Sequence, residues 1–180
     1  YYTTNAESIP TSTFFYTRFQ FDIAGNLLSS FNNLMSQNSE GARMIWNTPY
    51  SQFVRGELTL GRTWVFGRNS GQSIATRFLA GAGYAYGNST ALPFEKHFYA
   101  GGSNSLRGWQ ARTVGPGLSQ MDQSFVIPNQ TGDMKLEANI EYRFNMFWKV
   151  AGALFADAGN VWTLRSSGDA ETDPSMFRWD

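Results

Sequence analysis

Arg107 is the side chain whose surroundings point most directly to a specific contact. It stands in the Gly-rich run FEKHFYAGGSNSLRGWQARTVGPG, residues 94–117, between segments that alternate as β-strands do. A guanidinium is always charged, so a loop that carries Arg107 out of water has to supply a hydrogen-bonding or ionic partner for it. The chemistry that Arg107 could perform is therefore ion pairing. On these residues alone, however, an ordinary solvated loop arginine is the simpler interpretation.

Glycines on both sides of Arg107 would let the loop turn tightly and approach another surface closely. They are Gly101, Gly102 and Gly108, and the run Gly115-Pro116-Gly117 marks a further reversal of the chain. Each glycine alone is a weak signal, because glycine is common in loops. The run as a whole is more specific.

Catalytic and metal-binding chemistry find little support in this sequence. His97 is the only histidine, and Ser103 and Ser105 lie near it, but no GxSxG turn is present and no acid stands at a telling position beside them. A structural hydrogen bond is the better interpretation of His97. With one histidine and no cysteine, the chain has no metal-ligand spacing, and we expect neither a metal nor another cofactor.

Composition limits the class of protein. The 180 residues carry a formal net charge of zero, so there is no electrostatic argument for nucleic acid as a partner. Aromatic residues make up 16% of the chain, yet its mean hydropathy is −0.35. The longest apolar stretch, 150–156, is far too short for a spanning helix. Barrel strands, whose side chains face lipid and a polar interior in turn, average to a mean hydropathy near this value.

Five segments alternate with the period of two that places successive side chains on opposite faces of a strand. The fourth is the clearest, with Met134, Leu136 and Ile140 on one face and acids such as Glu141 on the other. In the fifth, Asp157 falls on the polar face. The run GAGYAYG lies inside the third segment, so it is no phosphate-binding loop, and its small residues would leave room for an inserted loop. The segments are 15–23, 54–64, 74–86, 134–144 and 148–157.

Short and long connections alternate between these segments, as they do in outer-membrane barrels. The short ones are 67–72 and 145–147, and the long ones lie near 25–50, 88–133 and 163–180. Aromatic residues near the segment ends would form the girdles at the membrane interfaces. They are Trp64, Phe66, Tyr84, Tyr86, Phe144, Phe147, Trp148 and Trp162. The pattern predicts an all-β, antiparallel transmembrane β-barrel, with a soluble β-sandwich as the alternative.

The runs GGSNSLRGW, ANIEYRF and LFADAGNVW resemble the BamA/TamA family of outer-membrane assembly barrels. In that family an extracellular loop folds back into the lumen, and its arginine meets carboxylates of the barrel wall. The resemblance implies that Arg107 contacts Glu141 and Asp157. An aromatic Phe or Tyr is usual in the family where Trp109 stands here, so the resemblance implies that Trp109 serves as an aromatic anchor. The loop motif consists of Gly101, Gly102, Ser105, Leu106, Arg107, Gly108 and Trp109.

Five strands cannot close a barrel, and open edges would leave backbone groups unpaired in lipid. The resemblance implies a sixteen-stranded barrel, so we expect residues 1–180 to be a partial barrel domain, about five strands with a lumen-inserted loop near 88–133. No secretory signal is recognisable, and the periplasmic POTRA domains of the family are not expected in this sequence.

The resemblance also implies a function without covalent chemistry. We expect a barrel in the outer membrane of a Gram-negative bacterium that inserts other barrels or translocates polypeptides. Its partners would be outer-membrane lipids, nascent outer-membrane proteins as clients, and accessory periplasmic or lipoprotein subunits. The alternatives are a passive pore or transporter barrel, in which Arg107 would face solvent or a constriction, and a soluble carbohydrate-binding β-sandwich or barrel enzyme, which would fold without detergent.

Overall fold

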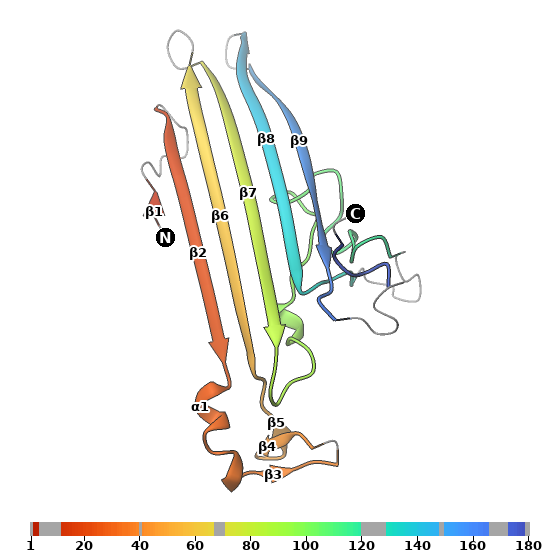
Figure 1. Cartoon of the computed structure of the whole chain (residues 1–180). Helices are drawn as coiled ribbons and strands as arrows, with labels where there is room; N and C mark the ends of the chain where they lie inside the picture. Colours follow the sequence, from red (N-terminus) through yellow and green to blue (C-terminus); the bar gives the residue numbers. More distant parts are fainter. Residues whose placement is uncertain are drawn as a thin grey trace.

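The fold is an open antiparallel sheet with one long connection laid against its face (Figure 1). The computed structural model describes residues 2–3, 12–39, 41–66, 71–119, 129–147, 150–165 and 173–178. Six strands form the main sheet in the order β1-β2-β6-β7-β8-β9, and every pair in it is antiparallel. The strands are β1 (Tyr2–Thr3), β2 (Phe14–Ala24), β6 (Phe53–Phe66), β7 (Gln72–Ala85), β8 (Met134–Phe147) and β9 (Val150–Trp162).

Smaller elements lie in the long connections. The segment between β2 and β6 holds two short helical turns and a three-stranded sheet of order β3-β4-β5, below the main sheet in Figure 1. A further helical turn follows β7. These elements are α1 (Asn26–Ser29), η1 (Asn32–Leu34), β3 (Ser36–Gln37), β4 (Arg43–Ile45), β5 (Thr48–Pro49) and η3 (Phe94–Lys96). Within the described ranges, no helix is long and apolar enough to cross a membrane.

The five predicted strands are confirmed as β2, β6, β7, β8 and β9, and the all-β antiparallel fold class with them. The structure adds β1 at the edge beside β2, and the small β3-β4-β5 sheet within a connection expected to be irregular. The fifth strand begins at Val150, while Trp148 and most of the predicted turn 67–72 lie outside the described residues. The sheet remains open, with β1 and β9 at its edges.

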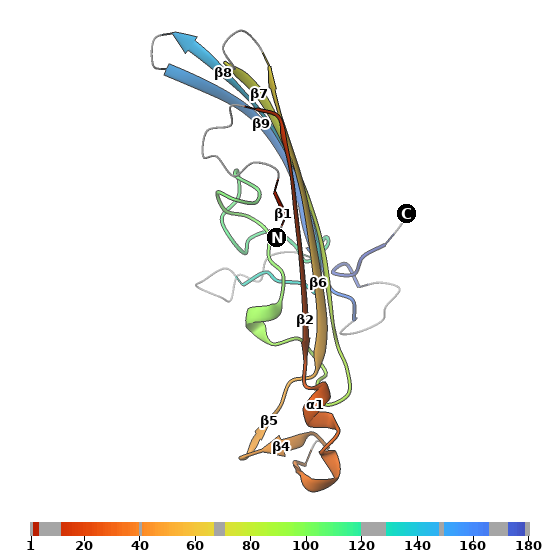
Figure 2. The ribbon, with the colours of Figure 1, turned by 90° about the vertical axis from the view of Figure 1, so that its left-hand side faces the viewer.

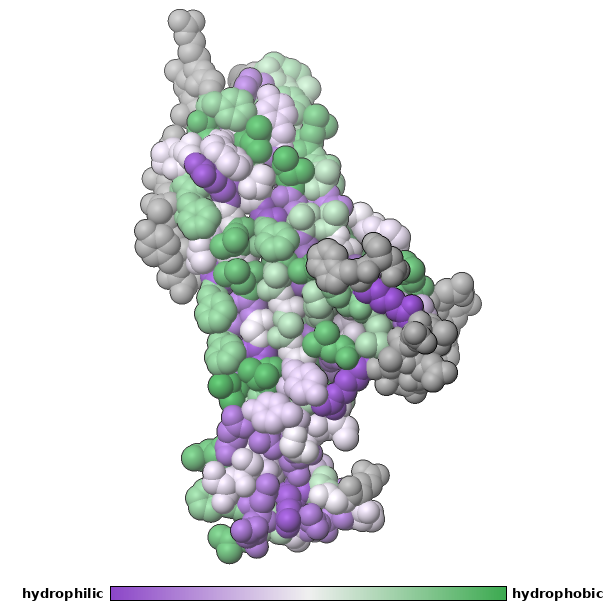
Figure 3. Space-filling model, viewed as in Figure 1, coloured by the Kyte–Doolittle hydropathy of each residue, from purple (hydrophilic) through white to green (hydrophobic). Residues whose placement is uncertain are grey.

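One face of the sheet is apolar and exposed. The register places outward side chains in rows across the strands, because Phe19 pairs with Leu58 and Leu60 with Phe78. Phe19 and Leu154 are 64% and 66% exposed on this face. In Figure 3, hydrophobic side chains gather over the strands, whereas hydrophilic ones surround the small sheet below them. This face suits hydrocarbon as its solvent.

Part of the opposite face is covered by the connection between β7 and β8, most of which lies on the concave side of the curved sheet (Figure 2). Loop residues Phe98, Ala100 and Leu106 pack with Val161 of β9 in a buried cluster. A second buried cluster joins Leu92 of the loop to Phe53 and Ala85 at the ends of β6 and β7. The described core therefore lies between the loop and the sheet.

Two strand glycines make room for this loop. A Cβ on Gly81 would come within 2.5 Å of the Phe98 ring, and one on Gly83 within 2.8 Å of the Leu92 side chain. Both glycines are on the loop-facing side of β7. The interpretation of the GAGYAYG run as small residues that accommodate an inserted loop is confirmed.

Candidate functional site

A compact turn presents Arg107 to the sheet. Gly101 and Gly102 have φ values of +97° and +96°, which side-chain-bearing residues rarely adopt. The Gly102 amide donates to the Trp109 carbonyl at 2.8 Å and closes the turn. Leu106 is buried in the cluster on β9, so the residue before Arg107 fixes the turn against the wall.

Arg107 donates hydrogen bonds from all three guanidinium nitrogens to carboxylates on two neighbouring strands, β8 and β9. Its Nε and Nη2 donate to the two carboxylate oxygens of Asp157, at 2.8 and 2.7 Å, in a bidentate pair. Its backbone N–H adds a third bond to Asp157 at 3.1 Å, and Nη1 donates to Glu141. The structure thus brings together the three residues that the family resemblance paired.

The surroundings strengthen these contacts by excluding water. The side chains of Arg107 and Asp157 are 23% and 6% exposed. The guanidinium lies 3.8 Å from the ring centroid of Phe155, which covers one of its faces. The hydrogen bonds to Asp157, and then to Glu141, raise the pKa of Arg107 above its ordinary value against the opposing effect of burial. The guanidinium is therefore charged at every physiological pH.

A second ionic cluster holds the same turn at Ser105, and sequence reasoning missed it. Glu137 on β8 is only 2% exposed. It accepts from Ser105 Oγ at 2.5 Å and from Lys135 Nζ at 2.8 Å, and it also pairs with Arg77 of β7. Arg77 in turn donates to the Asn104 carbonyl of the loop at 2.5 Å.

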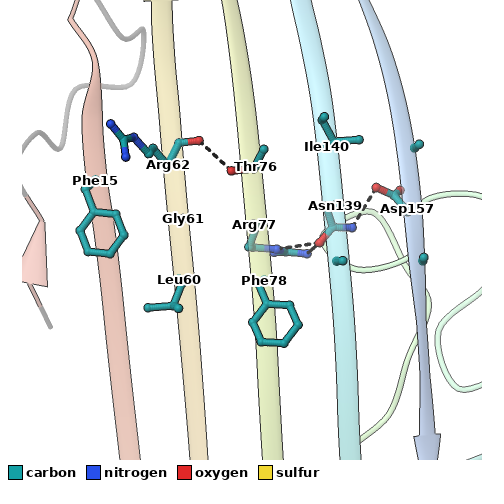
Figure 4. A pocket seen from close by; sticks show the side chains of 13 residues that line it. Phe15, Leu60, Gly61, Arg62, Thr76, Arg77, Phe78, Asn139, Ile140 and Asp157 are labelled. Carbon is teal, nitrogen blue, oxygen red and sulfur yellow. Dashed lines mark hydrogen bonds between the residues drawn. The ribbon is translucent and has the colours of Figure 1, made fainter.

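Asn139 connects the two clusters. Its side-chain oxygen accepts from Arg77, and its Nδ2 donates to Asp157 at 2.8 Å (Figure 4). The same Nδ2 also donates to the Ser105 carbonyl at 2.9 Å. The signal in the sequence was the uninterrupted polar face of β8, on which Lys135, Glu137 and Asn139 stand at every second position. That pattern identified the face without showing which of its residues the loop would contact.

A third contact fixes the start of the loop. Lys96 Nζ donates to Asp22 of β2 at 3.3 Å, and Arg55 of β6 donates to the Lys96 carbonyl at 3.1 Å. The Arg55 guanidinium also lies 4.1 Å from the Phe98 ring centroid. The loop is thereby tied to β2, β6, β7, β8 and β9.

Two residues of the motif lie differently from expectation. A Cβ on Gly108 would meet nothing within 4 Å, and this glycine does not have a positive φ, so neither turn geometry nor close approach requires it. The Trp109 side chain, expected to anchor the turn, is 60% exposed. Leu106 provides the buried anchor, while Trp109 contributes its backbone carbonyl.

His97 has a structural environment. Its Nδ1 lies 3.3 Å from Thr131 Oγ1, and its Nε2 lies 3.7 Å from Asp133 Oδ1. Across the part of the chain that the structure describes, no three acidic, histidine or cysteine side chains group as metal ligands would.

Comparison with known proteins identifies the family. The sequence profile of the Omp85 superfamily domain matches residues 1–178. The chain belongs to the Omp85 superfamily. Over 126 residues, 67% of the chain, it is 29% identical to the outer membrane protein assembly factor BamA of Neisseria meningitidis serogroup B. The chain spans 16% of the length of that relative.

Membership of the Omp85 superfamily confirms the resemblance to BamA/TamA-type barrels. It also confirms the outer membrane of a Gram-negative bacterium as the location. The apolar face of the sheet is then the face toward lipid, and the Arg107 loop lies on the opposite face.

Proposed function

We propose that this Omp85 chain is part of a barrel that assembles and inserts outer-membrane proteins or translocates polypeptides, and that the loop 88–133 is clamped inside its lumen by Arg107. The observation that carries the proposal is the set of bonds from three guanidinium nitrogens of Arg107 to Asp157 and Glu141. Nascent outer-membrane proteins are the proposed clients. Lipids of the membrane and accessory periplasmic or lipoprotein subunits are the proposed partners.

The clamp would make the position of the loop depend on the geometry of the wall. Glu141 and Asp157 stand on adjacent strands, because Glu141 pairs with Phe155 and Asp157 with Asn139 in the β8–β9 register. A planar guanidinium satisfies both carboxylates only while these strands keep their spacing. Separation or sliding of β8 against β9 would break bonds to Arg107 and release the loop.

The proposed activity needs no covalent step. A client strand can pair with an exposed strand edge through its backbone, and the energy comes from the hydrogen-bonded ladder it forms. In that scheme the residues of this chain brace the lumen and position the loop. They hold the wall in shape and do not react with the client.

A passive pore is the competing function, and the surroundings of Arg107 favour assembly over it. A pore arginine acts on passing ions, so its donors face water. Here the guanidinium donates to two carboxylates and has a ring against its face. Those bonds leave little of its charge available to a solute.

Charge reversal in the full-length protein tests the clamp. Arg107→Glu should reduce the amount of folded outer-membrane protein in cells that depend on this barrel, and Asp157→Arg or Glu141→Arg should partly restore it. Arg18→Glu is the matched control, since Arg18 shares the face of Arg107 but bonds to Gln20. Independent, additive losses in the double variants would contradict the clamp. Altered ion conductance with normal client levels would favour the pore.

A further inference from the structure

The lipid-facing surface contains a hollow that the loop does not touch. It has a volume of about 490 Å³ and spans β2, β6, β7, β8 and β9 (Figure 4). Phe15, Leu60 and Phe78 line it together with the smaller Ala138 and Ala158. Its volume falls in the range of small-molecule sites, roughly 300–1,000 Å³.

The register explains the hollow. Leu60, Phe78, Ala138 and Ala158 form one row across four strands, in which two large side chains are followed by two small ones. The surface therefore falls away over β8 and β9. A flexible hydrocarbon chain can follow such a step and keep van der Waals contact with the two alanines.

Arg62 is the one cation lining the hollow from the outward face. It belongs to the next row, between Phe15 and Thr76, and its side chain is exposed among apolar neighbours. Among the residues that the structure describes, no carboxylate lies within ion-pair distance of Arg62. Its guanidinium instead lies 5.0 Å from the Trp64 ring centroid.

A charged side chain on a barrel's lipid face is costly near the midplane, about 2–4 kcal/mol, and nearly free at the interface. Arg62 lies four residues before the end of β6, where the short connection to β7 begins. Outward Trp64, Phe66 and Tyr142 mark the interface there, and the rings of Phe66 and Tyr142 stack with centroids 6.3 Å apart. The guanidinium can therefore reach the headgroup layer, where phosphate is the abundant anion.

We propose that this hollow binds a glycerophospholipid, whose phosphate pairs with Arg62 and whose acyl chain lies over Ala138 and Ala158. Short connections of outer-membrane barrels are periplasmic, so Arg62 meets the periplasmic leaflet, and that leaflet is made of phospholipid. A guanidinium binds phosphate oxygens in the bidentate manner in which it binds carboxylates. The site is on the face away from Arg107 and is independent of the proposed clamp.

Native mass spectrometry of the full-length barrel in detergent, titrated with phosphatidylglycerol, tests the site. Arg62→Gln should lower the affinity for phosphatidylglycerol about 10- to 150-fold, because one charge-assisted contact is worth roughly 1.5–3 kcal/mol. Ala138→Leu should abolish the same binding step by filling the hollow with a side chain that suits the lipid-facing surface.

Two matched variants serve as controls. Ala80→Leu adds the same side chain to the outward face of β7 outside the hollow, and Arg18→Gln removes an arginine from the opposite face. Both should bind phosphatidylglycerol as the unaltered protein does. Equal binding by all four variants would overturn the proposal. Preferential retention of lipopolysaccharide through Arg62, or equal displacement of the lipid by inorganic phosphate, would also overturn it.

Discussion

Replacing Arg107 by lysine separates the geometry of the clamp from its charge. A lysine ammonium has one nitrogen in place of the three that now contact Asp157 and Glu141. At least one charge-assisted hydrogen bond is lost, which is worth roughly 1.5–3 kcal/mol. The fraction of molecules in which the Arg107 turn is locally open should rise about 10- to 150-fold.

Amide hydrogen exchange of the full-length barrel measures this opening, because exchange follows the free energy of local opening. The informative amides are those of Gly102, Trp109 and Arg112, which donate within the turn or to the Ala100 carbonyl. They should exchange faster by that factor in Arg107→Lys, whereas amides of the β6–β7 ladder should not change.

Arg18→Lys provides the matched control, since the Arg18 side chain donates to Gln20 on its own strand and not to the loop. It should leave the exchange of the turn unaltered. If Arg107→Lys changed the exchange of the turn less than about threefold, the bidentate pair would not hold the turn. The contacts of Glu137 and Lys96 would then suffice to hold the loop.

Three further outcomes are expected of the full-length barrel. Glu137→Gln should lower the stability measured by urea unfolding by roughly 3–5 kcal/mol, because it leaves the buried Lys135 ammonium without its anion, and an unchanged midpoint would contradict this. Gly81→Ala should expose the loop to protease by displacing the ring packed on it, whereas Gly56→Ala, whose added carbon meets only a side chain at 3.8 Å, should not. Gly101→Ala should impair growth in a complementation assay and Gly108→Ala should not, so equal growth would refute the turn geometry.

The long strands were predictable because the membrane imposes a two-sided pattern over ten or more residues. β8 shows this most clearly, with Ile140 exposed on one face and Glu137 buried on the other. Strands of two or three residues, such as β1 and β3, leave no such period, and they were not predicted.

The candidate site divides in the same way. The partners Glu141 and Asp157 came from a family resemblance, and their contact with Arg107 follows from the β8–β9 register. Glu137 could not be chosen from its strand, because Asn139 and Glu141 share its face and look equivalent in sequence. Only the path of the loop, which lays Ser105 beside Glu137, selects it.

Arg107 is anchored to residues that follow it in the chain, and this sets an order of events during folding. Arg107 and Asp157 are separated by 50 residues, and β8 lies between them in the chain. Contacts of such separation form late, because the intervening chain must first be ordered. The Arg107 turn therefore completes its contacts only after β9 has paired with β8, whereas the start of the loop, at Lys96, can already contact β2 and β6.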